Sequence, residues 1–158
     1  MASEASCWYF AYGSNMNVRR MEDRVRRRGI ERKLGYIQDY KMVFNKLASE
    51  SKGTGYANII PQSGAIVYGV LYKLTEKEMK TLDKYERVDE GHYQRKKLEI
   101  TVEENEQVTA YVYVALRTKE GLRPTQDYLK CIIEGAKENG LPQDYIQQLE
   151  TLETVQAA

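Results

Sequence analysis

The chain has 158 residues, enough for one domain that buries a core without disulfides or metal ions. Lys and Arg number 24 against 23 Asp and Glu, so the charge balance does not favour nucleic acid as a partner, and we expect the basic run over residues 24–28 to form the solvated face of a helix. Two separated cysteines, Cys7 and Cys131, and a single histidine, His92, offer neither a disulfide framework nor metal-ligand spacing. Because no apolar run approaches the roughly 20 residues of a membrane span and residues 1–6 lack the features of a signal peptide, we expect a cytoplasmic protein without membrane contact, metal or cofactor.

A strand, a turn and a helix are expected near the N-terminus. Residues 8–12 are aromatic and β-prone, and the pattern over 17–28 predicts a helix. Gly13 marks a sharp turn between them, because glycine adopts backbone angles closed to other residues. Ser14 and Asn15 favour N-cap positions, so we expect the helix to start there with free N–H groups directed into the turn. Such a junction can hold a carboxylate or an oxyanion, although the same pattern also occurs in an ordinary capped helix.

The middle of the chain is expected to be mostly β-sheet. Residues 32–46 read as extended, with a turn at Gln38-Asp39, and Pro61 is expected to stop a strand because proline cannot donate to a ladder. The other segments predicted here are a polar loop over 47–55, a strand over 56–60, a turn over 62–64 and a strand over 65–74.

The second half begins with a clear helix signal. Thr75 and Glu78 form a capping box, and Met79, Leu82 and Tyr85 or Glu86 fall on one face of the helix that follows. The remaining predicted elements are strands over 92–102 and 107–116 joined by the acidic turn 103–106, a helix from Pro124-Thr125 to about Lys137, and a short helix after Pro142 that carries Tyr145, Leu149 and Leu152.

These segments indicate an α+β domain built on a small, curved, mostly antiparallel sheet. We count six or so strands, with helices inserted at three places, and expect residues 8–152 to form one domain between the tails 1–7 and 153–158. The chain has 13 Tyr against 2 Phe and 1 Trp, which suits positions that are half in a core and half on a wet cavity. The periodicity alone does not distinguish an open sheet from a closed barrel.

The segment YFAYGSN over residues 9–15 resembles the N-terminal signature of the γ-glutamylcyclotransferase family, which includes the AIG2-like proteins. The resemblance runs from about Trp8 to Leu152 and implies a closed small barrel. Three later segments fit the same family in the same order, namely VYGVLY over 67–72, LDKYE over 82–86 with Gly91-His92-Tyr93, and Tyr128 with GAKENGLP over 135–142.

The resemblance also assigns site residues. A glutamate at a helix end is usually solvated, so the residues alone do not single out Glu86, but it occupies the family's catalytic position in Leu-Asp-x-x-Glu. Desolvation on the apolar face would raise its pKa, whereas Asp83 is expected to pack or pair near the helix and Glu90 to lie in a loop. The phenols of Tyr113 and Tyr128 are expected to donate to the substrate, and His92 to be structural or at the rim. The substrate-binding residues that the resemblance implies are Tyr9, Phe10, Ala11, Tyr12, Gly13, Ser14, Asn15, Tyr113 and Tyr128.

The implied reaction is an intramolecular aminolysis of a small γ-glutamyl compound. The substrate's own α-amine attacks its γ-carbonyl and yields 5-oxoproline and a free amino acid or amine, with Glu86 as base and acid. The backbone N–H groups around Gly13 and Ser14 would hold either the α-carboxylate or the γ-carbonyl oxygen. No metal or covalent enzyme intermediate is needed, because the nucleophile belongs to the substrate.

Three alternatives stay open at this point. The chain could be a non-catalytic small-ligand-binding or interaction protein that retains the fold, although an intact Glu86 and an intact Tyr-Gly-Ser-Asn turn favour catalysis. The leaving group could differ, for example an isopeptide of lysine or an acylated metabolite, and the loop 47–55 is expected to shape that side of the pocket. Catalysis by Cys7 or Cys131 is the less favoured mechanism, since neither has a nearby base in the sequence. A homodimer is left open.

Overall fold

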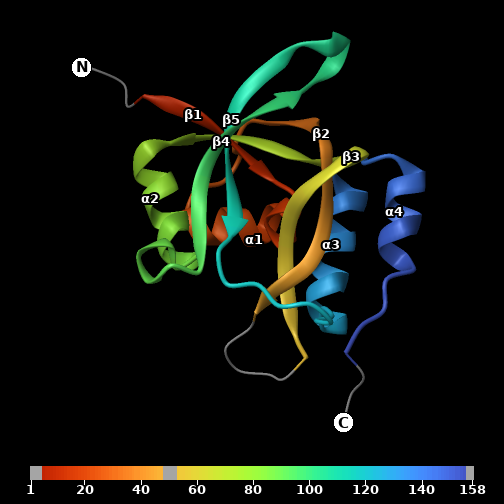
Figure 1. Cartoon of the computed structure of the whole chain (residues 1–158). Coiled ribbons are helices and arrows are strands. Elements are labelled where there is room, and N and C mark those ends of the chain that lie inside the picture. Colours follow the sequence, from red (N-terminus) through yellow and green to blue (C-terminus); the bar gives the residue numbers. More distant parts are fainter. Residues whose placement is uncertain (1–4, 48–52, 156–158) are drawn as a thin grey trace.

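A closed barrel lies at the centre of the part of the chain that this computed structural model describes, residues 5–47 and 53–155 (Figure 1). Most neighbouring strands are antiparallel, including β2 and β4, which meet at Tyr36 and Thr101. The strands β1 and β5 meet in parallel, at Tyr9 and Tyr111. The closure confirms the α+β barrel that the resemblance implies. The strands are β1 (Ser6–Ala11), β2 (Arg32–Leu47), β3 (Gly55–Thr75), β4 (Tyr93–Thr101) and β5 (Gln107–Ala115), and they follow one another around the barrel in the order β1-β3-β2-β4-β5.

The long strand β3 corrects the expectation that Pro61 ends a strand. Pro61 lies opposite Tyr40, beside the point where the β2–β3 register shifts between Gln38 and Tyr40. Asp39 takes up the extra residue with a φ of 65°, and its Oδ1 accepts a hydrogen bond from Gly64 N at 2.9 Å. Because an irregular ladder does not need every N–H group, proline is tolerated there. The strands expected over 56–60 and 65–74 are therefore one continuous strand.

Four α-helices of the described part surround the barrel (Figure 1). The helix expected over 17–28 is shorter, because Arg26 adopts a left-handed conformation with a φ of 59°. The capping box is confirmed, since Thr75 Oγ1 accepts from Glu78 N and Glu78 Oε1 accepts from Thr75 N. The helices are α1 (Val18–Val25), α2 (Glu76–Tyr85), α3 (Gln126–Glu138) and α4 (Gln143–Glu150), and the 3₁₀ turns are η1 (Ser14–Met16), η2 (Val88–Glu90) and η3 (Glu103–Asn105).

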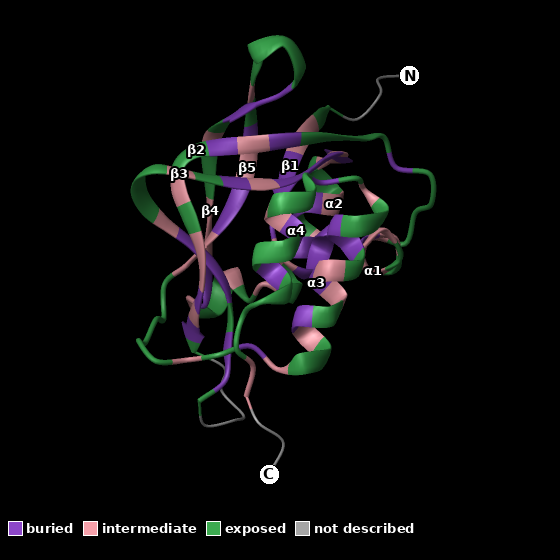
Figure 2. Cartoon of the chain, turned by 90° about the vertical axis from the view of Figure 1, so that its right-hand side faces the viewer, coloured by how far each residue is buried: buried purple, intermediate pink, exposed green. Residues whose placement is uncertain are grey.

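Helices α3 and α4 bury one face each and expose the other (Figure 2). On α3 the buried positions include Ile132 and Gly135, and a Cβ on Gly135 would lie only 2.5 Å from Asn17 N. Glycine therefore lets α3 lie directly against the chain that follows η1, which fixes that turn against the barrel. Leu152, expected on α4, lies beyond its end and is 39% exposed.

The predicted loop 47–55 and the predicted terminal tails lie partly outside the described residues. Leu47 and Gly55, the ends of the expected loop 47–55, belong to β2 and β3, and residues 48–52 lie outside the described part. The expected tails 1–7 and 153–158 are described only over 5–7 and 153–155, and β1 already begins at Ser6. Among the helices of the described residues, none is both long and apolar enough to cross a bilayer.

Candidate active site

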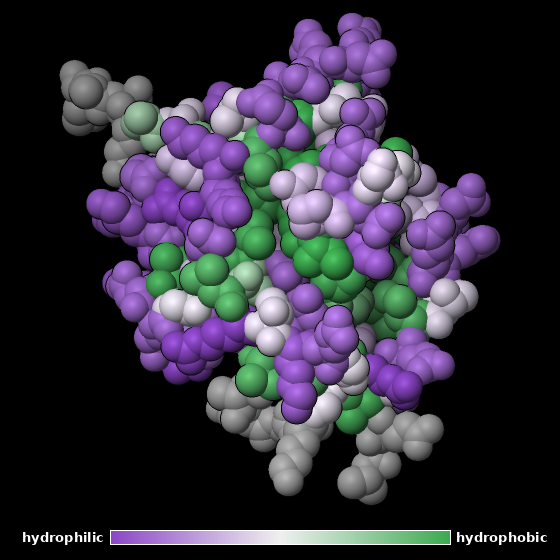
Figure 3. Space-filling model, viewed as in Figure 1, coloured by the Kyte–Doolittle hydropathy of each residue, from purple (hydrophilic) through white to green (hydrophobic). Residues whose placement is uncertain are grey.

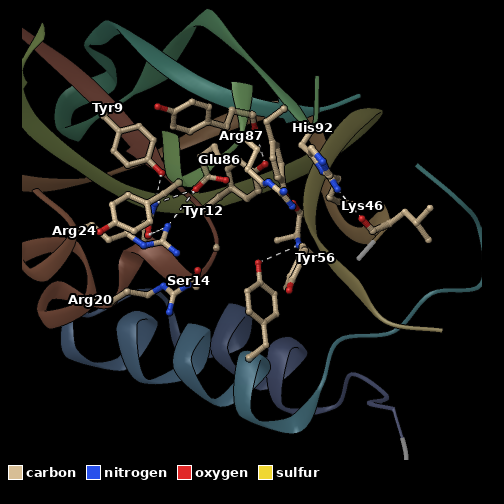
Figure 4. A pocket seen from close by; sticks show the side chains of 18 residues that line it. Tyr9, Tyr12, Ser14, Arg20, Arg24, Lys46, Tyr56, Glu86, Arg87 and His92 are labelled. Carbon is tan, nitrogen blue, oxygen red and sulfur yellow. Dashed lines mark hydrogen bonds and ion pairs between the residues drawn. The ribbon is translucent and has the colours of Figure 1, made fainter. Parts of the chain in front are cut away.

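A cavity of about 270 Å³ opens where the end of β1, the turn η1, the first turns of α1 and the end of α2 converge (Figure 4). It lies just below the size range of sites for drug-sized ligands, so it suits a small metabolite. Hydrophilic side chains cover much of the face seen in Figure 3, with apolar side chains gathered towards its middle. The cavity wall is rich in tyrosine and basic side chains, and Glu86 is a carboxylate among them.

Glu86 immediately follows the last residue of α2, and its backbone N–H still donates to Leu82 O at 2.9 Å. The side chain is only 17% exposed and points into the cavity. Burial raises the pKa of the Glu86 carboxyl, and Arg24, Arg20 and Asn15 offset part of that rise. The expected desolvated carboxylate at the end of the capped helix is therefore present, and Tyr85, which is 50% exposed, also lines the cavity.

A small network fixes the Glu86 carboxylate. Asn15 Nδ2 donates to Tyr9 Oη at 3.0 Å and to Glu86 Oε1 at 3.5 Å. Arg24 Nη1 donates to Asn15 Oδ1 at 3.1 Å and to Glu86 Oε1 at 3.4 Å. The Arg24 guanidinium also lies over the Tyr85 ring, 4.7 Å from its centroid. These contacts hold the carboxylate in one orientation through Oε1, whereas Oε2 takes no part in this network.

The turn after β1 differs in detail from its sequence prediction. Ser14 and Asn15 do not cap α1 but form η1, whose hydrogen bonds are donated by the N–H groups of Met16 and Asn17, and the cap is Asn17, which accepts from Arg20 N at 3.2 Å. Gly13 has a φ of −115°, so the left-handed freedom of glycine is not used. Space is the reason for glycine instead, because an added Cβ would lie 3.2 Å from Ala57 Cβ. The N–H groups of Ser14 and Asn15 do not take part in the two hydrogen bonds of η1, as at the start of any helix.

The other expected tyrosines line the cavity in different ways. Tyr113 donates its hydroxyl proton to Asp83 Oδ1 at 2.7 Å. Although Tyr113 lines the cavity, this proton is therefore not available to a substrate, contrary to the prediction. Tyr128 Oη accepts from Ala57 N at 3.1 Å and can therefore donate its proton elsewhere. Burial raises the pKa of Tyr128 to about 12, so the phenol stays protonated. Tyr12, also in the wall, donates to Tyr113 O at 2.6 Å.

Two of the expected binding residues do not reach the cavity. Phe10 and Ala11 are buried in the barrel core and are not among the residues of its wall. Successive side chains on a strand point to opposite faces, so Phe10 points away from the face of Tyr9. Ala11 lies on the face of Tyr9, but its short side chain is buried in the core. Tyr9, Tyr12, Gly13, Ser14, Asn15, Glu86, Tyr113 and Tyr128 are the expected residues that the structure does bring together there.

The local competitors of Glu86 fall outside the cavity. Asp83 pairs with Arg95 at 2.7 Å, as expected of a structural carboxylate. Glu90 pairs with Arg87 at 2.8 Å, and both side chains are largely exposed. His92 is buried beside the cavity, where a rim or structural residue was expected. Over residues 5–47 and 53–155, no three His, Cys, Asp or Glu side chains group as a metal site would require.

Several basic or aromatic wall residues were missed by sequence reasoning, among them Arg20, Arg24, Lys46 and Tyr93. Arg24 belongs to the run expected to be a solvated helix face, yet it turns inward to Glu86, and Arg20 lies one turn earlier with its Nε buried and unpaired within the described residues. A repeat of arginine at i and i+4 was the available signal, since such residues share a helix face. Lys46 and Tyr93 come from separate strands and gave no local signal.

Comparison with known proteins assigns this architecture to a family. The AIG2-like family matches residues 66–149. The gamma-glutamylcyclotransferase of Homo sapiens is 31% identical over 156 residues, which cover 95% of this chain and 80% of that protein, and the one of Bos taurus is 32% identical over 148 residues, covering 92% and 78%. A solved gamma-glutamyl cyclotransferase structure superposes with a TM-score of 0.88 at 30% identity and covers 97% of this chain and 91% of its own. A yeast gamma-glutamyl cyclotransferase specific to glutathione, at 11% identity and a TM-score of 0.66, shares the fold.

The chain belongs to the γ-glutamylcyclotransferase family, and it is an enzyme of that class.

Proposed function

We propose that this enzyme converts small γ-glutamyl compounds into 5-oxoproline and the free amino acid or amine, with Glu86 as general base and then general acid. The observation that carries the proposal is the Glu86 carboxylate, which faces the cavity, is largely buried and has a raised pKa. A carboxylate with these properties accepts and returns a proton near neutral pH more readily than a solvated one.

The proton transfers follow from the chemistry of ring closure. The ionised Glu86 takes a proton from the substrate's α-ammonium, because only the free amine is nucleophilic. The amine then attacks the γ-carbonyl carbon and forms a C–N bond, and Glu86 returns its proton to the leaving nitrogen as the original amide bond breaks. The attacking nitrogen loses its second proton, which the released amine takes up, so the products are the neutral lactam and an ammonium. Both nitrogens belong to one folded substrate, so one carboxylate held by Asn15 and Arg24 can reach them in turn.

The turn η1 beside Glu86 supplies hydrogen-bond donors for an oxygen atom of the substrate. The N–H groups of Ser14 and Asn15, at the start of η1, would donate to a substrate oxygen, either the α-carboxylate or the γ-carbonyl as it becomes an oxyanion. Arg20, with its buried and unpaired Nε in the described structure, lies on the same side of Glu86 and favours the α-carboxylate there (Figure 4). Tyr128 supports the proposal as a further donor from α3.

Purified enzyme incubated with a panel of γ-glutamyl compounds tests the proposal directly. We expect 5-oxoproline to appear in equal amount to the released amine, and its release to depend on Glu86. A folded enzyme that binds these compounds without forming 5-oxoproline would show that the cavity is a binding site only.

A further inference from the structure

Lys46, on β2, places a buried ammonium group in the wall of the same cavity. The residue is only 2% exposed, and its Nζ donates to Leu47 O at 2.6 Å. The Tyr93 ring lies 5.8 Å from Nζ. Among the described residues, no carboxylate forms an ion pair with Lys46, although a buried charge is costly unless it is paired.

The surroundings of Lys46 make this end of the cavity positive. Arg87 and His92 line the wall beside Lys46, and Arg117 Nη1 lies 3.4 Å from His92 Nε2. Burial lowers the pKa of Lys46, and the charges of Arg117 and Arg87 lower it further. Glu90 pairs with Arg87 on the exposed side, and the charge of Glu86 offsets part of the lowering of the Lys46 pKa without forming an ion pair with Lys46 in the described structure. An anion that enters the cavity would therefore find a desolvated cation whose charge is not yet compensated.

The positive end lies opposite the turn that receives the γ-glutamyl group. Figure 4 shows Ser14, Arg20 and Arg24 on one side of Glu86, and Lys46 and His92 on the other. A substrate whose α-amine and scissile amide both meet Glu86 must extend its leaving group away from the turn. The atoms just beyond the leaving nitrogen then point towards Lys46.

We propose that Lys46 binds a carboxylate on the leaving group and is therefore a specificity-determining residue of this enzyme. This inference rests on the proposed function and assigns a residue to the leaving-group side of that site. In an amino-acid conjugate the carboxylate lies one carbon from the leaving nitrogen, so it follows the scissile bond directly. A simple alkylamine leaves Lys46 without a counterion.

A matched pair of substrates isolates the carboxylate. γ-Glutamyl-alanine and γ-glutamyl-alaninamide differ only in a charged carboxylate against a neutral carboxamide, so their ratio of kcat/KM measures the contribution of that charge. The variants are Lys46→Met, which keeps the length of the side chain, and Lys46→Arg, which keeps the charge. Lys41→Met is the matched control, because Lys41 is an exposed lysine of the same strand that does not line the cavity.

We expect the unmodified enzyme to prefer the carboxylate substrate, and Lys46→Met to lower kcat/KM for it by about 10- to 100-fold, the range of a charge-assisted hydrogen bond. Turnover of the carboxamide should change by less than about threefold, Lys46→Arg should retain part of the preference, and Lys41→Met should change neither substrate. Equal losses for both substrates, or no loss, would overturn the role of Lys46. Absence of 5-oxoproline from both substrates with unmodified enzyme would instead overturn the proposed function, and this inference with it.

Thermal unfolding separates binding from structure. Because Lys46 is a buried cation without an ionic partner in the described part of the chain, Lys46→Met should leave the Tm of the empty enzyme unchanged or raise it. A γ-glutamyl-alanine complex of the enzyme with Glu86→Gln should show a larger Tm increase than the same complex that also carries Lys46→Met. A large fall in Tm for Lys46→Met alone would show a structural role and contradict the proposal.

Discussion

The Glu86 carboxylate experiences two opposing influences. Burial disfavours its ionised form, whereas Arg24, Arg20 and Asn15 favour it, and the pKa is raised on balance. The Arg24–Glu86 distance of 3.4 Å is longer than that of a close ion pair, so the guanidinium orients the carboxylate without fully compensating its burial. A site arranged in this way maintains a base at a cost in stability.

Replacing Glu86 by Gln should therefore separate activity from stability. The amide keeps the shape of the side chain but cannot take a proton, so we expect kcat/KM to fall by at least about 10²-fold. The same change should not lower the Tm near neutral pH, because it removes an ionised group that folding disfavours. Rates of 5-oxoproline formation and thermal unfolding curves give the two readouts.

Asp89→Asn is the matched control for this variant. Asp89 is an exposed acid three residues further on that does not line the cavity, so its removal should leave the rate unchanged. Activity of Glu86→Gln above about a tenth of the unmodified rate would exclude Glu86 as the base.

The raised pKa also gives a signed pH dependence. Glu86 must be ionised to act as a base, so kcat/KM should fall as the pH drops through its folded pKa, which lies above the ordinary glutamate value of about 4.3. A raised folded pKa contributes stability below the unfolded pKa and loses it as the pH rises through the folded pKa. The Tm gained by Glu86→Gln near neutral pH should therefore shrink on acidification. An acid limb at or below the ordinary value would contradict this assignment.

At the level of single residues, the family resemblance singled out Glu86 and the turn after β1, but neither the resemblance nor the local pattern indicated the cations around them. Arg24 was expected in solvent because it belongs to a basic run, and charge runs usually form solvated faces. The structure turns Arg24 inward because α1 begins directly after η1 and packs its inner face beside α2. The repeat of arginine at i and i+4 indicates that Arg20 and Arg24 share one face of α1, but whether that face turns inward depends on tertiary packing.

At the level of elements, the turn η1 connects β1 to α1 in the space beneath α3. Gly13 lies where a Cβ would approach Ala57 Cβ at 3.2 Å and Tyr128 Oη at 3.6 Å, and Gly135 gives α3 a close approach to Asn17. The position of the Ser14 and Asn15 N–H groups thus depends on two glycines that are far apart in the sequence. Close backbone packing of this kind tolerates few side chains.

Gly13→Val should consequently damage activity far more than Ser14→Ala. Valine adds branched carbon atoms where only a tight methyl contact is available, so the turn must shift and its N–H groups with it. Ser14→Ala removes a hydroxyl but leaves the backbone donor in place. We expect kcat/KM to fall much further for Gly13→Val, with both variants folded by circular dichroism.

The comparison of these two variants also tests the backbone contact itself. If Ser14→Ala is as damaging as Gly13→Val, the serine hydroxyl is the main substrate contact and the proposed role of the N–H groups is wrong. A Gly13→Ala variant provides the intermediate case, because its single methyl meets Ala57 without the branch of valine.

Local signals predicted most elements, and the failures have local causes. The Thr75–Glu78 capping box fixed the start of α2 because both of its hydrogen bonds are made within one turn. The prediction that Pro61 ends a strand was wrong, because whether a proline interrupts a strand depends on the register of the opposite strand. Here the β2–β3 register shifts at Asp39, next to Tyr40, the partner of Pro61. A contact between residues that are distant in sequence leaves no trace in the pattern of either segment.

At the level of the whole molecule, barrel closure brings the parts of the site together. Closure rests on a parallel contact between Tyr9 and Tyr111 and an antiparallel one between Tyr36 and Thr101. It places the end of β1 near α2 and near β5, so Tyr9 can contact both Asn15 and the ring of Tyr113. Lys46 reaches the same cavity from β2, which is why its place in the wall could not be inferred before the topology was known.

The composition of the cavity leads to a prediction about metal ions for the enzyme as a whole. Among the described residues, its wall contains one carboxylate and one imidazole, Glu86 and His92, and no three groups cluster as a metal site would require. Catalytic metal sites ordinarily use three protein ligands, and the basic side chains around Glu86 would repel a cation. Treatment with a strong chelator followed by desalting should therefore leave the rate of 5-oxoproline formation unchanged, with a zinc hydrolase as the positive control. A loss of activity that a divalent ion restores would show that a metal takes part and that Glu86 does not act alone.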